Sequence, residues 1–186
     1  LIFGSGPLSG TIAPGAGRFN VTGRSPLGFL GDTNSSGHWA PALKFAGYDH
    51  LVFTGCADSP VMLFIDDGKA ELVDARELWG LDTWETQRRI RRKYRDHRIE
   101  VACIGPAGEK RVRFASVRTG LKRSAARTGM GAVMGSKNLK AIAVRGSQGV
   151  KVARPAELMN AVRKCGHFVE AIALQRGFKA GDAAGT

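Results

Sequence analysis

Short runs of alternating apolar and polar residues recur along this chain and predict a series of β-strands. The clearest two runs, 61–66 and 69–74, flank Asp67-Gly68, and Asp-Gly between alternating runs is a strong signal for a β-hairpin. Further strands are predicted at 1–3, 18–22, 51–54, 99–104, 111–117 and 139–144. The pattern therefore indicates a β-rich fold.

Helical signals are fewer and lie between these strands. Residues 38–47 are expected to form a short helix, because the polar loop before them, 31–37, is rich in helix-starting residues. The sequence DTWE at 82–85 matches a capping box, and the helix that follows it would place Trp84 and Gln87 on its inner face. The fold expected from these signals is α+β, with a few helices around β-structure.

The C-terminal part differs from the rest because its apolar residues recur at helical spacing. Pro155 fits the first turn of a helix, which we expect to continue to about Arg176. The small and polar tail at 179–186 is expected to be mobile. We therefore expect one domain at 1–150, followed by a helix and a tail at 151–186.

Two halves of the predicted domain resemble each other. LIFGSGPLSG resembles VACIGPAGEK, and ALKFAGYDHLVFTG resembles MGSKNLKAIAVRG. Between these segments each half has an arginine-bearing strand, RFNV or RFAS, and then a polar glycine loop, TNSSG or ARTGMG. We expect an internal duplication, with two β-rich subdomains at roughly 1–75 and 76–150 related by a pseudo-twofold axis.

The net charge of +12 suits a solvated basic surface, a nucleic-acid binder or a host for a polyanionic cofactor. Much of it lies at 88–98, on the predicted outer face of a helix, where a solvated surface is the usual role. Nucleic-acid binding would need exposed aromatic residues among the basic ones, whereas Phe19, Phe45 and Phe114 are expected to point inward. A nucleic-acid partner is therefore not expected.

The three cysteines, Cys56, Cys103 and Cys165, are far apart and form no C-x-x-C pair. We expect buried, inert thiols, and no zinc site or iron–sulfur cluster carried by this chain alone. No apolar run approaches the ~20 residues of a membrane span, and no signal peptide is found, so a cytoplasmic protein is expected. The chain starts without Met and inside a predicted strand, which indicates a fragment.

Three loops combine glycine, small side chains and basic residues, as backbone cradles for anions require. These loops are GAGR at 15–18, TNSSG at 33–37 and RSAARTGMG at 123–131. None of them matches a P-loop or a dinucleotide-binding fingerprint. We interpret the upstream loops and the stretch 121–146 as two halves of one cofactor-binding site.

The motifs GPLSGTIAPGAGRFNV, GDTNSSGHWAPALKFAGYD, ACIGPAGEKRVRFA and GMGAVMGSKNLKAIAVRG resemble, in this order, the N-terminal domain of the tungsten-containing aldehyde ferredoxin oxidoreductase family. The resemblance covers the chain to about residue 165. It implies two related β-rich subdomains that form a base for a tungsten bis-pyranopterin cofactor. In that family the pterin dithiolenes supply the sulfur ligands, so tungsten would need no cysteine from this chain.

The resemblance assigns cofactor contacts in the first half of the chain by motif position. Arg18 in GAGRFN corresponds to an arginine that contacts one pterin. The backbone of Asn34 would help to hold the magnesium ion that bridges the pterin phosphates. Ser36 and Gly37 would contact the cofactor, and Ser36 stands where many relatives have glycine.

In the second half, Arg123, Ser124, Ala126 and Arg127 match a family stretch rich in Arg, Ala and Gly. The two arginines would bind pterin or phosphate through charge-assisted hydrogen bonds. The backbone of Ser124 would supply the second magnesium ligand. Ala126 and Thr128 stand where glycines are usual, so a positive φ at either position would be costly.

The resemblance implies oxidation of a small aldehyde to a carboxylic acid in anaerobic metabolism, with electrons passing through a [4Fe–4S] cluster to ferredoxin or another electron-transfer subunit. The cluster ligands and the acid/base residues belong to C-terminal domains or a complementary subunit, so no catalytic residue is assigned here and the fragment alone should be inactive. Two alternatives stay open: a class II benzoyl-CoA-type aromatic ring reductase, and a basic nucleic-acid-binding module without catalysis.

Overall fold

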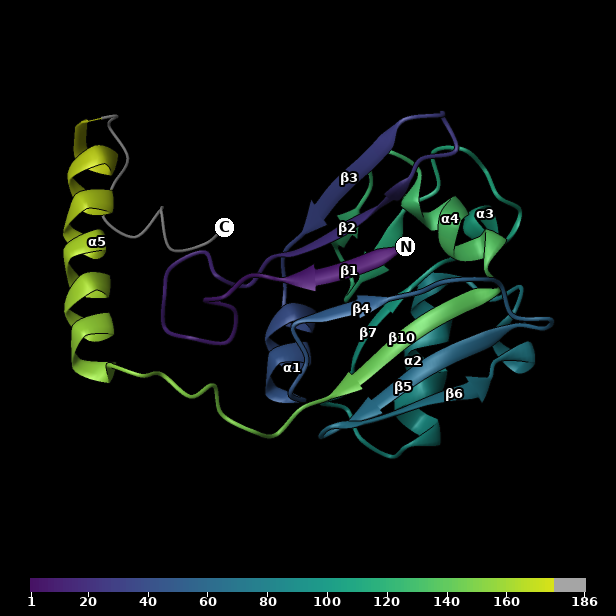
Figure 1. Ribbon diagram of the computed structural model, residues 1–186, viewed down its shortest axis with the longest axis horizontal. Helices are drawn as coiled ribbons and strands as arrows, with labels where there is room; N and C mark the ends of the chain where they lie inside the picture. Colours follow the sequence, from purple (N-terminus) through teal and green to yellow (C-terminus); the bar gives the residue numbers. More distant parts are fainter. Residues whose placement is uncertain (176–186) are drawn as a thin grey trace.

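A computed structural model describes residues 1–175, with side chains to residue 166, and shows two β-sheets with short helices around them (Figure 1). The strands are β1 Ile2–Ser5, β2 Phe19–Arg24, β3 Leu30–Ser35, β4 His50–Val52, β5 Val61–Asp66, β6 Lys69–Asp74, β7 Glu100–Cys103, β8 Val117–Thr119, β9 Arg123–Ala125 and β10 Leu139–Arg145. The helices are α1 Trp39–Phe45, α2 Thr83–Lys93, α3 Pro106–Glu109, α4 Met130–Ser136 and α5 Pro155–Gln175, with a 3-10 turn at Arg76–Leu78. The expected α+β fold is confirmed.

The two sheets repeat one strand order. The first sheet runs β3-β2-β1-β4, and the second contains β9-β8-β7-β10 in the same arrangement. All strand pairs within these two units are antiparallel. Along the chain, a helix joins the last two strands of each unit: α1 joins β3 to β4, and α4 joins β9 to β10. This repeated topology supports the predicted internal duplication.

The hairpin of β5 and β6 is an addition to the second unit. Its turn at Asp67-Gly68 is where the sequence predicts it, and β5 pairs in parallel with β10. The boundary between the two sheets therefore lies between Val52 and Val61, and the hairpin extends the second sheet. The division into subdomains near residue 75 stays a prediction.

One of two hydrophobic clusters among the described residues joins the two sheets, and the other packs α2 against the second sheet. Trp39 of α1 is fully buried, with its ring centroid 5.6 Å from that of Phe3 and 4.8 Å from that of Phe19. Its indole Nε1 donates a hydrogen bond to the carbonyl oxygen of Ile142 in β10, at 3.2 Å. Because a buried Trp requires a partner for its N–H, this bond anchors the first unit to the central strand of the second.

The predicted loop at 31–37 was wrong, because residues 30–35 form the edge strand β3. Gly31, Thr33 and Ser35 face the core, while Asp32 and Asn34 face solvent. The inner positions are small because other side chains occupy the space there. A Cβ atom at Gly31 would lie 2.5 Å from the Cε atom of Met130.

The predicted strand at 111–117 was also wrong. Most of this segment forms turns, and the strand β8 begins only at Val117. Arg111 has a positive φ of 57°, which reverses the chain after α3. Phe114 is 81% exposed, so its expected inward orientation is not observed.

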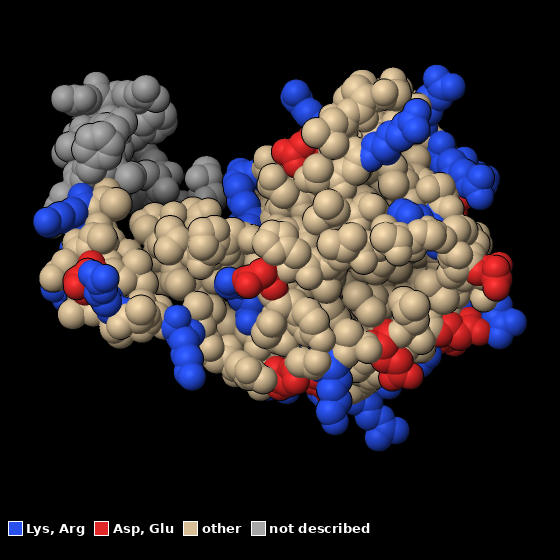
Figure 2. All heavy atoms as spheres, viewed as in Figure 1, with Lys and Arg blue, Asp and Glu red and all other residues tan. Residues whose placement is uncertain are grey.

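The helix predicted after DTWE is α2, and its N-cap is confirmed. Asp82 accepts hydrogen bonds from the backbone N–H groups of Trp84 and Glu85, both at 2.8 Å. Gln87 is buried as expected, but Trp84 is 58% exposed. The arginines at 88, 89, 92 and 95 are exposed, so the solvated basic face is confirmed. Figure 2 shows that Lys and Arg side chains also project from many parts of the margin of the face in view.

The cysteines are not all buried. Cys103 is, and burial raises the pKa of its thiol to about 12, so it is inert. Cys56 and Cys165 are exposed, which corrects the expectation for both. Within the described residues there is no cluster of three or more His, Cys, Asp or Glu suited to a metal ion. Within the same residues no helix has the length and apolarity to cross a bilayer.

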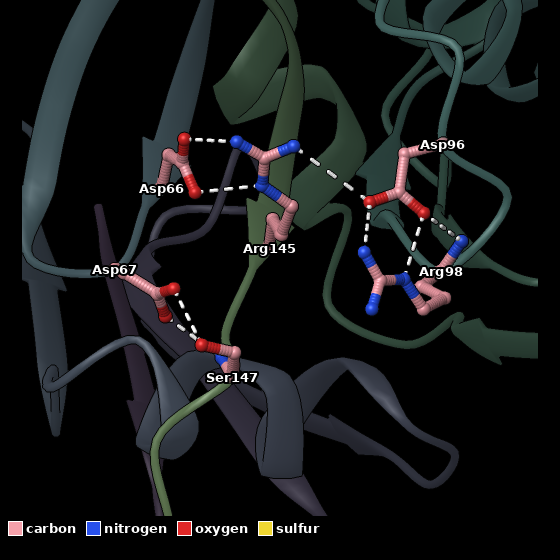
Figure 3. A network of polar contacts seen from close by, with 6 residues as sticks. All are labelled: Asp66, Asp67, Asp96, Arg98, Arg145 and Ser147. Carbon is pink, nitrogen blue, oxygen red and sulfur yellow. Dashed lines mark hydrogen bonds and ion pairs between the residues drawn. The ribbon is translucent and has the colours of Figure 1, made fainter.

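The C-terminal helix α5 begins at Pro155 as predicted and stands apart from both sheets in Figure 1. The tail at 179–186 lies outside the described residues. The chain that leaves β10 toward α5 is held by a network of polar residues (Figure 3). This network consists of Asp66, Asp67, Asp96, Arg98, Arg145 and Ser147.

Arg145 is the centre of the network. Its Nε donates to Asp66 Oδ1 at 2.7 Å, and its Nη1 lies 3.7 Å from Asp96 Oδ2. Asp96 also accepts hydrogen bonds from the backbone N, Nε and Nη2 of Arg98, at 2.9, 3.0 and 2.9 Å. The Arg98 guanidinium and backbone N–H hold the pKa of the Asp96 carboxyl well below its usual range.

Because the pKa of Asp96 is depressed in the folded state, ionised Asp96 stabilises the fold at every pH above the pKa of an unfolded carboxyl, about 3.9. This stabilisation is lost as the pH falls through the pKa of the folded state. We therefore expect the free energy of unfolding to depend less on pH below about 4 in Asp96→Asn than in the wild type. Urea unfolding from about pH 2 to 6 measures this. Asp58→Asn is the control, since Asp58 is exposed and has no hydrogen bond or ion pair among the described residues. Equal slopes for Asp96→Asn and wild type would contradict the prediction.

Candidate functional site

The two sheets meet along their edge strands, β3 and β9. Here the backbone N–H of Arg127 donates to Thr33 Oγ1 at 3.3 Å, and Ser25 Oγ donates to the carbonyl oxygen of Thr128 at 2.9 Å. We call this junction, formed by 31–37 and 119–128, the seam. Because β3 and β9 are equivalent strands of the repeat, the seam brings equivalent segments of the two units together.

The predicted residues of the first half lie on one side of the seam. Arg18 precedes β2, is exposed, and donates from Nη1 to Asn34 Oδ1 on β3. Asn34 is exposed and pairs with Asn20 in the ladder between β2 and β3. The nearby carboxylate of Asp32 accepts hydrogen bonds only from neutral side chains in this sheet. Arg18 and Asn34 are thus held together on the outer face of the first sheet.

Gly37 connects the two sides of the seam. A Cβ atom on Gly37 would lie 3.8 Å from the Cγ of Arg123 and 4.0 Å from Thr119 Oγ1. Gly37 has a φ of +125°, which an L side chain rarely adopts, and its carbonyl oxygen lies 3.1 Å from where a Cβ atom of Gly17 would be. The structure therefore brings Gly37 and Arg123 together, while Ser36 beside them is half-buried.

The predicted residues of the second half lie on β9 and directly after it. Arg123 and Ser124 pair with Thr119 and Arg118 of β8, and Arg123 is exposed. Ala126 and Arg127 follow as exposed residues. All the residues predicted from sequence for this site therefore lie in the seam or, like Arg18, contact it.

Ala126 and Thr128, which stand where glycine is usual, differ in their backbone conformations. Ala126 is not among the residues with positive φ, so it meets no special backbone requirement. Thr128 has a φ of +61°, which costs about 1–2 kcal/mol for a residue with a side chain. The bond from Ser25 Oγ to the Thr128 carbonyl helps to hold this conformation. The expected backbone cost is therefore real at Thr128 and absent at Ala126.

The seam carries basic side chains that are not neutralised within the described residues. Arg18, Lys122, Arg123 and Arg127 are exposed, and none of them lies within 4.0 Å of a carboxylate there. Arg145, by contrast, is paired with acids in the network of Figure 3. Unpaired guanidinium groups beside a glycine are suited to a bulky anion such as a phosphate.

A buried hydroxyl group in the seam was missed by the sequence analysis. Thr119 is 2% exposed, and its Oγ1 has no hydrogen-bond partner among the described residues. This Oγ1 atom and the Cγ atom of Arg123 lie 4.0 and 3.8 Å from where a Cβ atom of Gly37 would be. Its only sequence signal is its place in β8, a strand of three residues that the alternating pattern did not predict.

Comparison with known proteins gives the family of this fold. The family model described as "Aldehyde ferredoxin oxidoreductase, N-terminal domain" matches residues 1–146. A tungsten-containing aldehyde ferredoxin oxidoreductase of Pyrococcus horikoshii is 47% identical over 165 residues, which are 88% of this chain and 27% of the relative. The WOR-like subunit of an aliphatic sulfonate oxidoreductase of Pyrococcus furiosus is 38% identical over 161 residues, covering 79% of this chain and 25% of that protein.

A solved structure agrees with the sequence matches. The active site complex BamBC of benzoyl coenzyme A reductase, in complex with 1,5-dienoyl-CoA, superposes with a TM-score of 0.89 at 41% identity, over 92% of this chain and 26% of that chain. The present chain thus spans about a quarter of the length of the relatives it matches. The match over 1–146 and the identities to these oxidoreductases confirm the resemblance: this chain belongs to the aldehyde ferredoxin oxidoreductase N-terminal domain family.

Proposed function

We propose that this chain is the cofactor-binding part of a tungsten bis-pyranopterin oxidoreductase, and that the seam holds the pterin phosphates. The observation that carries the proposal is the group of unpaired cations, Arg18, Arg123 and Arg127, at the junction where the two sheets meet. Because equivalent edge strands of the repeat meet here, the site suits a ligand with two similar arms. The tungsten-containing relatives support the choice of ligand.

Each residue of the seam has a defined part in this proposal. The guanidinium groups of Arg18, Arg123 and Arg127 bind the anionic arms through charge-assisted hydrogen bonds. Ser36, Gly37 and Ala126 offer backbone contacts where side chains leave room. The proposed magnesium ligands are the backbone carbonyl groups of Asn34 and Ser124. Backbone carbonyl groups are ordinary ligands of hard cations.

The residues present fit this group. A magnesium site of backbone and phosphate oxygens needs no cluster of acidic side chains, and the described residues have none. Tungsten bound by the pterin needs no thiolate of this chain, in agreement with the inert thiol of Cys103. When bound, the cofactor supplies two-electron redox chemistry, and the residues of this chain bind and orient it.

The complete enzyme, in this proposal, oxidises a small aldehyde to a carboxylic acid in the cytoplasm. The remaining domains or a complementary subunit provide the [4Fe–4S] cluster and the groups that move protons, and electrons leave to ferredoxin or another electron-transfer subunit. The relatives are more than three times as long as this chain, which leaves room for these parts. This chain on its own would be inactive.

Aromatic ring reduction is a second candidate, because the BamBC complex of benzoyl coenzyme A reductase superposes with a TM-score of 0.89. The residues of the seam do not distinguish aromatic ring reduction from aldehyde oxidation, since both reactions would need the same binding of the cofactor arms. Substrate contacts outside this chain would decide between them.

The test is elemental and pterin analysis of the full-length enzyme, purified without oxygen. We expect stoichiometric tungsten together with released pterin. Aldehyde-dependent reduction of a dye, against dye-dependent reduction of an aryl-CoA thioester, then separates the two reactions. An anaerobic preparation without tungsten, molybdenum or pterin would overturn the proposal.

A further inference from the structure

A groove borders the seam where the first turn of α2 meets the turn between β8 and β9, and of its lining residues only Leu121 also belongs to the seam. It has a volume of about 500 Å³, and its walls include Trp84 and Gln87 from α2 and Leu121 from the turn. This volume lies within the range of binding pockets in proteins. The function proposed above uses none of these residues.

The walls of the groove expose two large apolar side chains. Trp84 is 58% exposed and Leu121 is 64% exposed, and neither belongs to the core clusters of the two sheets. Tryptophan beside arginine is the combination most enriched at the centres of protein interfaces. Arg88 and Arg91 complete this combination, because both line the same groove.

Gln87 provides a hydrogen-bond acceptor without a partner. Its Nε2 donates to the carbonyl oxygens of Thr83 and Gly120, both at 3.0 Å, so the amide cannot be turned round without placing its oxygen against two carbonyl groups. Gln87 is 3% exposed, and its Oε1 has no donor among the described residues. A buried acceptor without a partner costs about 1–3 kcal/mol. An incoming N–H group would remove this cost.

The charge around the groove is positive on balance, because four cations, Arg88, Arg91, Arg118 and Lys122, stand against two carboxylates, Asp82 and Glu85. Arg91 donates from Nε to the Ile99 carbonyl at 2.9 Å, and Arg118 donates from Nη2 to the Leu121 carbonyl at 2.6 Å. Neither of these arginines nor Lys122, next to Leu121, lies within 4.0 Å of a carboxylate among the described residues. The one arginine of the groove that is neutralised is Arg88, which pairs with Glu85.

We propose that this groove binds an acidic segment of another polypeptide. An apolar side chain of the segment lies between Trp84 and Leu121. A backbone N–H of the segment donates to Gln87 Oε1 when binding opens the groove enough to expose that buried atom. Carboxylates on either side of the apolar residue lie near the unpaired cations, Arg91, Arg118 and Lys122. A nucleic acid fits less well, because it needs a row of free cations and Glu85 neutralises those at the start of α2.

The test is a selection of displayed random peptides on the immobilised full-length enzyme, followed by measurement of Kd for synthetic copies of the enriched peptides by fluorescence anisotropy. We expect peptides with Asp or Glu around one aromatic or aliphatic residue. Trp84→Ala and Leu121→Ala should each weaken binding about tenfold or more. Leu72→Ala is the matched control, because Leu72 is 62% exposed on β6, away from the groove, and should leave Kd unchanged.

A double variant tests whether the cations beside the groove contribute to peptide binding. Arg118→Gln with Lys122→Gln should weaken peptide binding, and this loss should shrink as the NaCl concentration rises from about 0.05 to 0.5 M. Circular dichroism and thermal unfolding verify that each variant is folded.

Several outcomes would overturn the proposal. They are peptides no more enriched on wild type than on Trp84→Ala, enriched peptides without carboxylates, and a Kd unaffected by Leu121→Ala. Self-association of the chain that Leu121→Ala abolishes would assign the groove to a second copy instead. Binding of a labelled oligothymidylate that depends on Trp84, without binding of acidic peptides, would assign it to nucleic acid.

Discussion

Replacing Gly135 by alanine is expected to destabilise this domain by about 3 kcal/mol or more, which lowers its Tm by roughly 6–12 °C. Gly135 lies in α4 and is buried against α3. A Cβ atom there would overlap the carbonyl oxygen of Gly108 and lie 2.7 Å from its carbon. Backbone atoms cannot rotate away as a side chain does, so the two helices would have to separate.

Separation of α3 from α4 would also shift residues around the two helices, because Gly108 on α3 is closely packed as well. A Cβ atom on Gly108 would lie 2.7 Å from Ile104 Cβ and 3.0 Å from the carbonyl oxygen of Gly131. Ile104 is fully buried in the core shared by the two sheets. Moving α4 also moves the segment before it, 123–129, which carries the seam.

Gly166→Ala is the matched control, since it makes the same change inside a helix, α5, where no atom of the described residues lies within 4 Å of the new Cβ. Alanine is favoured over glycine in a helix by about 1 kcal/mol, so this variant should be as stable as wild type or slightly more stable. Thermal unfolding followed by circular dichroism measures both variants. A Gly135→Ala protein with the wild-type Tm would show that α3 and α4 separate at little cost.

The sequence was sufficient for the elements with strong local signals. Asp67-Gly68 between alternating runs predicted the hairpin of β5 and β6, and Asp82 predicted the start of α2. The edge strand β3 was missed because its inner residues are Gly31, Thr33 and Ser35, whose polarity resembles that of a loop. The strands β8 and β9 have three residues each, too few for a periodic pattern.

The residues of the candidate site were predicted from the sequence, but the contact between the two sheets that brings them together was not. The family resemblance assigned Arg18, Asn34 and Arg123 by motif position, but no local pattern states that β3 and β9 meet. That contact joins Thr33 to Arg127, 94 residues apart, and it depends on how two whole sheets pack. For the same reason the buried hydroxyl of Thr119 was missed, because its surroundings come from distant segments.

Replacing both Arg18 and Arg123 by glutamine is expected to weaken cofactor binding by the full-length enzyme by about 10²–10⁴-fold. Hydrogen bonds to charged groups contribute about 1.5–3 kcal/mol each, and 1.4 kcal/mol corresponds to a factor of ten. The two arginines come from different units of the repeat: Arg18 donates to Asn34 on β3, and Arg123 lies beside Gly37, which follows β3. Because the segments that carry them are close, the single variants are needed to show whether their effects add.

The measurement is the content of tungsten and released pterin after anaerobic gel filtration, which reports binding without relying on activity. Arg92→Gln with Lys110→Gln removes the same charge from exposed residues outside the seam that have no ion pair among the described residues, and should leave the content unchanged. Arg18 and Arg123 are themselves exposed, so the double variant should unfold at nearly the wild-type temperature once both proteins are stripped of cofactor. Full cofactor content in the double variant would place the anion-binding groups elsewhere. Equal loss in the control variant would show that net charge governs cofactor retention, and that the geometry of the seam does not.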